Sequence, residues 1–295
     1  MLELRNVVKT FGKNVRAVDD VSVTLPSGVV GLIGHNGAGK TTLMQMIATI
    51  AKPTSGHILF DGVDIVKKPE AMRARLGFLP QDFGVYPNLS ALEFMQYFAA
   101  LKGVRDPGRI RRLLELVNLH DHAHRQAAGF SGGMRRRLGI AQALLNDPDV
   151  LIVDEPTAGL DPEERLRFRH LLSEIGFRKL VIVSTHIVSD IENMAGQLAV
   201  MNQGRLVACD TPDSFVQRAR NQVWSVTVAA QDYDALRAQV QVLQAQRHAD
   251  GITLRIAHPT SPLAGAVPVE PTLEEALMAQ RYALSAVRGS VELAA

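Results

Sequence analysis

Cysteine is almost absent from this sequence, since Cys209 is the only one in 295 residues. A fold held together by disulfide bridges is therefore excluded, and a reducing compartment fits the composition. Long apolar runs are also missing, because no window approaches the roughly 18 apolar residues that cross a bilayer. The N-terminus, Met1–Arg5, does not look like a secretory signal peptide, because it lacks an apolar core segment of the needed length. We expect a chain that is soluble by itself, so any action at a membrane would need spans supplied by another polypeptide.

An excess of charge of one sign is missing too. Lys and Arg total 32 while Asp and Glu total 30, so the formal net charge is only +2. This value does not indicate nucleic acid as a partner, because binding to a phosphate backbone depends on a clustered excess of Lys and Arg. Hydrophobic residues, in contrast, make up 46% of the chain. That is enough to bury a sizeable core in one large domain or two smaller ones.

The stretch Gly34–Thr42 matches the phosphate-binding motif G-x-x-x-x-G-K-[ST] at every fixed position. The apolar run Val29–Ile33 before it predicts a buried strand, and Leu43–Ala48 after it predicts a helix. Glycines let backbone N–H groups turn toward phosphate oxygens, and the start of the helix adds the positive end of its dipole. The full match disfavours the alternative, a glycine-rich turn without a ligand. We expect nucleotide contacts from the whole loop: Gly34, His35, Asn36, Gly37, Ala38, Gly39, Lys40, Thr41 and Thr42.

Four residues are expected to carry the phosphate chemistry. Lys40 would bridge the β- and γ-phosphates, and Thr41 would hold Mg²⁺. Downstream, the apolar run Val150–Val153 predicts a buried strand that ends in Asp154 and Glu155. In a P-loop enzyme the first acid holds Mg²⁺ and the second orients the attacking water. The alternative, two acids on a solvated loop, is disfavoured by the P-loop upstream.

Three further positions are ambiguous from the residues alone. His186 ends the apolar strand Lys179–Thr185, and ligands bind at the carboxyl ends of strands in α/β sheets, so it is expected to contact the γ-phosphate. A lone histidine at a strand end is nevertheless more often structural. Phe11 lies on an expected loop between the first two strands, where it either stacks on adenine or is an ordinary turn aromatic. Ser131–Gly133 either lets a backbone approach phosphate or simply begins a helix that runs to about Asn146.

The remaining patterns divide the chain. Ser90 and Glu93 form a predicted capping box that opens a helical stretch inserted between two strands. The composition changes after Asn221. We therefore assign residues 1–220 to one domain, with a helical subdomain at about 88–146, and residues 221–295 to a small C-terminal region. In that region the predicted elements are a strand at Gln222–Ala229, a helix at Tyr233–Ala245, a strand at Gly251–Ala257, a loop at His258–Pro271 and a helix at Leu273–Tyr282.

Taken in order, these motifs resemble those of the ATP-binding cassette (ABC) ATPases. The P-loop alone indicates only an NTPase. The specific features are Ser131–Gly133 followed closely by Val150–Glu155, with Gln81, Gly159–Asp161 and His186 in the matching order. The resemblance covers about residues 1–220. It implies an α/β fold of the P-loop NTPase class, with a mixed sheet core, an antiparallel β subdomain, an inserted helical subdomain and a small α+β C-terminal region.

The resemblance also implies roles for individual residues, with ATP and Mg²⁺ as cofactors. Phe11 would stack on adenine, and Gln81 would sense Mg²⁺ and face a membrane subunit. Glu155 would be the catalytic carboxylate and His186 the γ-phosphate sensor. The implied catalytic set is Lys40, Glu155 and His186; the metal ligands are Thr41, Gln81 and Asp154; the nucleotide contacts beyond the P-loop are Phe11, Gln81, Ser131, Gly132, Gly133 and Asp161.

Such ATPases work as head-to-tail dimers, in which the serine and glycines of one subunit close over ATP bound to the other. The resemblance therefore implies a homodimer or heterodimer of ATPase subunits, bound to a separate multi-span permease at the cytoplasmic face of the membrane, with no nucleic acid. Pro80–Pro87 and Phe130–Arg137 look like bacterial ABC-2 type exporters, and Pro271–Glu275 is similar to the tail of drug- and antibiotic-export ATPases.

Two residues depart from the commonest signature. Phe130 stands where leucine is usual, and Met134 where glutamine is usual, but the phosphate-facing serine and glycines are intact. A second hypothesis is an ABC-type ATPase without a membrane partner, acting as a mechanical switch on nucleic acid or the ribosome. Those proteins usually carry two cassettes or long coiled-coil insertions, whereas this chain has one P-loop, no heptads and a near-neutral charge.

Overall fold

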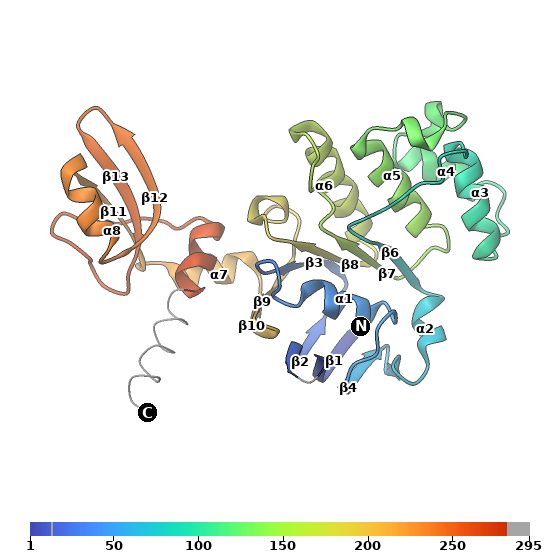
Figure 1. Ribbon diagram of the computed structural model, residues 1–295, viewed down its shortest axis with the longest axis horizontal. Coiled ribbons are helices and arrows are strands. Elements are labelled where there is room, and N and C mark those ends of the chain that lie inside the picture. The colour runs from blue at the N-terminus through green and yellow to red at the C-terminus, as the bar shows by residue number, and fades with distance from the viewer. Residues whose placement is uncertain (13, 282–295) are drawn as a thin grey trace. The chain divides into compact units, whose positions relative to one another are not determined.

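The computed structural model describes residues 1–12 and 14–281 (Figure 1). The chain divides into two compact units, Met1–Cys209 and Asp210–Ala295. Our functional division into 1–220 and 221–295 stays a prediction. Among the described residues, no helix is both long and apolar enough to span a bilayer.

The first unit is built on a six-stranded sheet of order β10-β9-β3-β8-β7-β6. Strands β9, β3, β8, β7 and β6 pair in parallel, and β7 and β8 are buried along their whole length. Parallel sheets covered on both faces have such continuous apolar strands, so the buried strands predicted from the apolar runs are present. The bounds are β3 Gly28–Ile33, β6 Leu76–Leu79, β7 Val150–Asp154, β8 Leu180–Thr185, β9 Gln197–Asn202 and β10 Arg205–Asp210.

A second, four-stranded antiparallel sheet has the order β2-β1-β4-β5. Its strands are β1 Leu2–Phe11, β2 Val15–Leu25, β4 Ser55–Phe60 and β5 Val63–Asp64. Helix α1 (Lys40–Ile47) lies between the two sheets (Figure 1), and Met44 and Met46 are buried in a core to which both sheets contribute. The expected loop position of Phe11 was wrong, because β1 continues to Phe11, which pairs with Val15.

The helical elements of this unit include an insertion between β6 and β7, and α5 and α6 pack against the six-stranded sheet. Ser90 and Glu93 form the capping box at the start of α3, as predicted. Ser131 accepts the Met134 N–H at the start of α5, and Asp161 caps α6, which packs on β3 and β8. The bounds are α2 Pro69–Arg73, α3 Ala91–Leu101, α4 Arg109–Leu116, α5 Gly132–Ala143 and α6 Pro162–Gly176, with 3-10 turns at His120–His122, Ala127–Gly129 and Val188–Asp190.

The second unit contains a four-stranded sheet of order β12-β13-β11-β14. Its elements are α7 Pro212–Ala219, β11 Val223–Val228, a 3-10 turn at Ala230–Asp232, α8 Tyr233–Arg237, β12 Gln241–His248, β13 Gly251–Ala257 and β14 Val267–Pro268. A helix also covers residues 273–281, as predicted, and Thr272 caps it. Its predicted end, Tyr282, lies outside the described residues.

One predicted helix of this unit was wrong over most of its length. Helix α8 ends at Arg237, and Gln241–His248 forms strand β12 instead of continuing the helix. Pairing with β13 places Val242 opposite Ile256 and Ala245 opposite Leu254. The gain from these cross-strand pairs outweighs the modest helical preference of glutamine and alanine, because secondary-structure propensity is a weak prior that tertiary pairing overrides.

Candidate active site

The P-loop joins the carboxyl end of β3 to α1, and two of its glycines, Gly34 and Gly39, lie where neighbouring strands leave no space for a side chain. Gly39 has a φ of 99°, and a Cβ there would lie 2.3 Å from the carbonyl oxygen of Ala17 in β2. A Cβ on Gly34 would lie 2.6 Å from the carbonyl oxygen of Met201 in β9. These close approaches require glycine and hold the loop at the end of the parallel strands, and the first residues of α1, Lys40, Thr41 and Thr42, line the cavity there.

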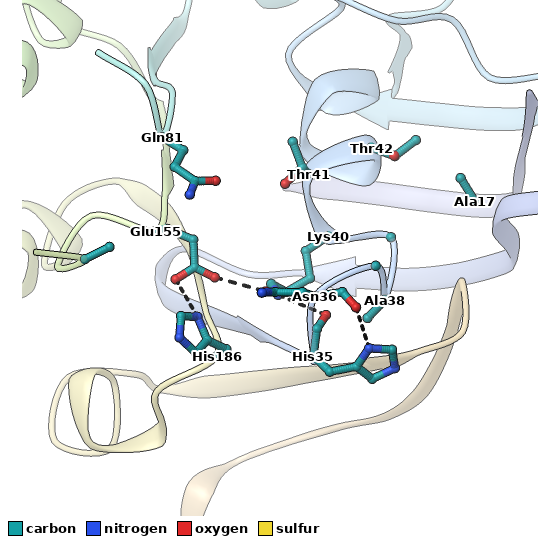
Figure 2. Close-up of a pocket in the computed structure, with 13 residues that line it drawn as sticks. Ala17, His35, Asn36, Ala38, Lys40, Thr41, Thr42, Gln81, Glu155 and His186 are labelled. Carbon is teal, nitrogen blue, oxygen red and sulfur yellow. Dashed lines mark hydrogen bonds and ion pairs between the residues drawn. The ribbon is translucent and has the colours of Figure 1, made fainter.

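Lys40, Glu155 and His186 meet at one wall of the site (Figure 2). The Lys40 Nζ donates to the Gly34 carbonyl oxygen at 2.6 Å and lies 3.7 Å from Glu155 Oε1. The Glu155 Oε2 accepts from His186 Nδ1 at 2.9 Å. Lys40 and Glu155 are 6% and 7% exposed, so the opposite charges of this pair compensate each other in a largely buried setting. The carboxylate of Glu155 is thereby held between a cation and an imidazole.

Ser184 in β8 organises both acids at the end of β7. Its hydroxyl donates to Asp154, which is 2% exposed, and its Oγ accepts the Glu155 backbone N–H at 3.0 Å. Glu155 itself has a φ of 44°, in the left-handed region that residues other than glycine seldom adopt. The turn after β7 therefore directs the two adjacent side chains differently, with Glu155 at the cavity and Asp154 buried against β8.

The cavity has a volume of about 440 Å³ and is lined by segments far apart in the sequence. In Figure 2, Gln81 lies across the cavity from Thr41, with Glu155 and His186 on the Gln81 side. The structure therefore brings together the P-loop, Gln81, the second acid and the histidine. The lining residues are Ala17, His35, Asn36, Gly37, Ala38, Gly39, Lys40, Thr41, Thr42, Gln81, Glu155, Ala158 and His186.

Other predicted site residues lie outside this lining. Phe11 is the last residue of β1, 46% exposed, and the Lys9 Nζ lies 5.0 Å from its ring centroid. Asp161 accepts the Glu164 N–H at 2.9 Å as the cap of α6. Ser131 and Gly132 are exposed at the start of α5. Within one chain, the structure thus separates the Ser-Gly-Gly segment from the P-loop cavity.

Four residues that contribute to the site were missed from the sequence. Ala17 and Ala158 line the cavity through small side chains, which carry no recognisable signal. Ser184 lies within a strand of mostly apolar residues, and the sequence pattern did not mark it as a site residue. Arg136 donates from Nη1 to the Glu155 carbonyl oxygen at 3.0 Å and from Nη2 to the Ala158 carbonyl oxygen at 3.1 Å. The three consecutive arginines were visible in the sequence, but not which of them reaches this loop.

The donor chemistry fits a hard divalent cation bound together with phosphate. Thr41, Gln81 and Asp154 offer hydroxyl, amide and carboxylate oxygens, which are the ligands that Mg²⁺ prefers. Among residues 1–12 and 14–281, no group of three or more His, Cys, Asp or Glu could hold a metal ion by itself. In nucleotide sites Mg²⁺ is usually bound by one or two carboxylates plus substrate phosphates, so the donors present match that pattern.

Similarity to known proteins identifies the family. Residues 18–158 match the ABC transporter family profile. Over 216 residues the chain is 36% identical to the ABC transporter ATP-binding protein NatA of Bacillus subtilis (strain 168), which covers 71% of this chain and 88% of NatA. The chain belongs to the ATP-binding proteins of ABC transporters. The predicted family and the predicted P-loop α/β fold are thereby confirmed, and the chain is an ATP-binding protein with ATP hydrolase activity.

Two other relatives of this ABC ATPase are named for export or transport. It is 37% identical over 221 residues to the Nod factor export ATP-binding protein I of Cupriavidus metallidurans, covering 73% of each chain. It is 34% identical over 210 residues to the bacitracin transport ATP-binding protein BcrA of Enterococcus faecalis, covering 70% of this chain and 68% of BcrA.

Among solved structures, the chain is similar to the ATP-binding cassette MJ0796, a dimer in a post-hydrolysis state bound to ADP and Pi. The TM-score is 0.65 at 26% identity, covering 72% of this chain and 98% of MJ0796. It is also similar to cbiO1 from Clostridium perfringens, part of the ABC transporter complex cbiONQ. That TM-score is 0.67 at 27% identity, covering 72% of this chain and 89% of cbiO1.

Proposed function

We propose that this chain is the nucleotide-binding subunit that energises an ABC exporter. ATP closes two ATPase subunits head to tail, hydrolysis reopens them, and the motion is passed to a separate multi-span permease. The subunit would act at the cytoplasmic face of the membrane, bound to that permease. The observation that carries the catalytic part of this proposal is Glu155, held between Lys40 and His186 in the wall of the P-loop cavity.

In this mechanism the chain positions groups and neutralises charge. Lys40 binds the β- and γ-phosphate oxygens of ATP, leaving the Gly34 carbonyl to which it now donates. Glu155 orients the attacking water and accepts its proton, while His186 contacts the γ-phosphate and holds the carboxylate in place. Mg²⁺ bound by Thr41, Gln81 and Asp154 would neutralise charge on the phosphate oxygens.

Two observations support a site completed by a second subunit. Ser131 and Gly132 are exposed and lie outside the P-loop cavity of their own chain. The MJ0796 cassette, which resembles 72% of this chain, is dimeric. We therefore propose that Ser131, Gly132 and Gly133 bind ATP held by the opposite ATPase subunit, whether identical or not. A helix N-terminus with free N–H groups suits the γ-phosphate that they would meet.

The export direction is supported by similarity to proteins named for Nod factor export and bacitracin transport. To test for the proposed permease partner, the tagged chain is captured from its native membranes in mild detergent, and the bound proteins are identified by mass spectrometry. We expect a stoichiometric multi-span protein that raises ATP turnover when both are reconstituted in vesicles. Untagged membranes provide the control. An eluate containing the intact ATPase without a membrane protein would contradict the exporter and favour the switch without a membrane partner.

A further inference from the structure

We propose that Arg136 is a positioning residue for Glu155, acting from the signature helix α5 on the turn that carries the catalytic carboxylate. Its guanidinium spans that turn, since Nη1 donates to the Glu155 carbonyl oxygen at 3.0 Å and Nη2 to the Ala158 carbonyl oxygen at 3.1 Å. Two parallel hydrogen bonds from one planar group fix both the position and the orientation of what they hold. This inference rests on the proposed role of Glu155 in hydrolysis.

The turn needs such support because its backbone is strained. The φ of Glu155 is 44°. This left-handed conformation costs free energy in a residue other than glycine, so it persists only where the surrounding structure holds the backbone in place. On the amino side, the Glu155 N–H is held by Ser184 Oγ at 3.0 Å. On the carbonyl side, the side-chain contact comes from Arg136, alongside a long backbone bond of 3.4 Å from the Ala158 N–H. Without Arg136, the Glu155 carbonyl oxygen loses the shorter of these two hydrogen bonds.

The three consecutive arginines differ in what they hold. Arg135 donates to the Phe130 carbonyl oxygen at 2.8 Å, within the same segment. Arg137 donates to the carbonyl oxygens of Val117 and Asn118 and contacts Glu164. These contacts stabilise the packing of α5 on α4 and α6. Of these three arginines, Arg136 is the one that hydrogen-bonds to the loop after β7, and it links α5 to the turn that carries the catalytic carboxylate.

The environment of Arg136 indicates that the contact is specific. Arg136 is partly buried, and this burial lowers the pKa of its guanidinium, while the negative charges of Asp82 and Glu155 oppose the shift. Asp82 follows Gln81, which lines the ATP cavity. Arg136 therefore lies where the segment after β6, the signature helix and the catalytic turn come together. A movement of α5 relative to the sheet would displace the backbone of Glu155 through these hydrogen bonds.

The test uses two substitutions in the full chain. Arg136→Met removes the donors but keeps a long side chain, and Arg136→Lys keeps the charge but cannot span both carbonyls. We expect Arg136→Met to lower kcat between about tenfold and a hundredfold, because small displacements of a catalytic group have effects of that size. ATP affinity and the melting temperature should stay close to wild type, and Arg136→Lys should recover part of kcat. Arg111→Met is the charge-matched control, because Arg111 is 84% exposed in α4 and paired with Glu115.

A purely structural role would lower the melting temperature, ATP affinity and kcat together, and that result would overturn the proposal, as would a wild-type kcat in Arg136→Met. A second measurement addresses the route through Glu155. Because the two residues act as a unit, adding Arg136→Met to Glu155→Gln should lower the residual turnover little further. If Glu155→Gln alone leaves turnover intact, the proposed function fails. If Glu155→Gln abolishes turnover while Arg136→Met does not affect it, only this inference fails.

Discussion

At the scale of single residues, Glu155 is the proposed catalytic carboxylate. Its carboxylate meets Lys40 and His186, and its turn places it at the cavity. We expect Glu155→Gln to lower kcat at least a hundredfold, because a positioned general base contributes about that much or more. ATP binding should persist, since the amide removes no positive charge. The variant should accumulate as an ATP-bound dimer, measured by size-exclusion chromatography with light scattering in excess MgATP.

The control for this variant is Glu163→Gln. Glu163 is 75% exposed on α6 and pairs with Arg167, so it changes the net charge equally without touching the cavity. It should hydrolyse ATP like the wild type and return to monomers as ATP is consumed. Monomeric elution of Glu155→Gln with saturating MgATP would contradict both the catalytic assignment and the ATP-driven dimer.

At the scale of elements, the helix at 273–281 in the second unit begins with an ionic capping box. Glu275 accepts from the Thr272 N–H at 2.8 Å and from Arg255 Nη2 at 2.7 Å, while its own N–H donates to Thr272 Oγ1. Burial raises the pKa of the Glu275 carboxyl, but the hydrogen bonds from Arg255 and Thr272 outweigh it, so the pKa lies below its usual range. A carboxyl whose pKa is lowered by folding stabilises the fold at every pH above the pKa that it has in the unfolded chain. This contribution is lost as the pH falls through the pKa that it has in the folded chain.

Glu275→Gln should therefore destabilise the second unit by about 2 kcal/mol at neutral pH, the scale of a hydrogen bond to a charged group. The difference from wild type should begin to shrink as pH falls below 4.5, the ordinary pKa of a glutamate carboxyl, and should vanish only below the lowered pKa of folded Glu275, where the wild-type carboxyl is neutral as well. Trp224, the only tryptophan in the sequence, lies in β11 and donates to the His258 carbonyl oxygen at 2.9 Å. Its fluorescence during denaturant unfolding reports on this unit in the intact chain. A difference that does not depend on pH would exclude the ionised capping box as its cause.

At the scale of the whole molecule, the ATP site is proposed to need two chains. Gly132 is exposed at the start of α5, and a Cβ there would have nothing within 4 Å, so a side chain fits in the single chain. Gly132→Asp should leave the melting temperature and ATP binding unchanged, since an acid in the first helical turn is favourable. It should abolish hydrolysis, because the carboxylate would face the γ-phosphate held by the partner subunit.

Subunit mixing makes this test decisive. Lys40→Ala removes the lysine that is proposed to bind phosphate but leaves the Ser131–Gly133 segment intact. Each variant alone should be inactive, whereas a mixture forms dimers in which one intact P-loop faces one intact signature. ATP turnover should therefore reappear on mixing, and it is measured by phosphate release. If the mixture is no more active than its components, the shared site is contradicted.

Much of the first unit could be predicted because its signals are local. The apolar runs that became β7 and β8 are buried on both faces, and the capping box at Ser90 and Glu93 depends on residues only three apart. Errors arose where distant pairing decides the outcome. Gln241–His248 has no strong local preference and becomes a strand because β13 lies beside it, and β1 extends to Phe11 because β2 supplies partners.

The sequence by itself determined the P-loop, the two acids, the family and the glycines that the loop requires, because these depend on residue type at fixed spacing. Only the tertiary structure showed that Ser184 organises both acids, that Arg136 reaches the turn after β7 and that Ser131–Gly133 lies outside the cavity of its own chain. The physical reason is that these relations join residues far apart along the chain. Their contacts follow from how the strands and α5 pack, which no local pattern encodes.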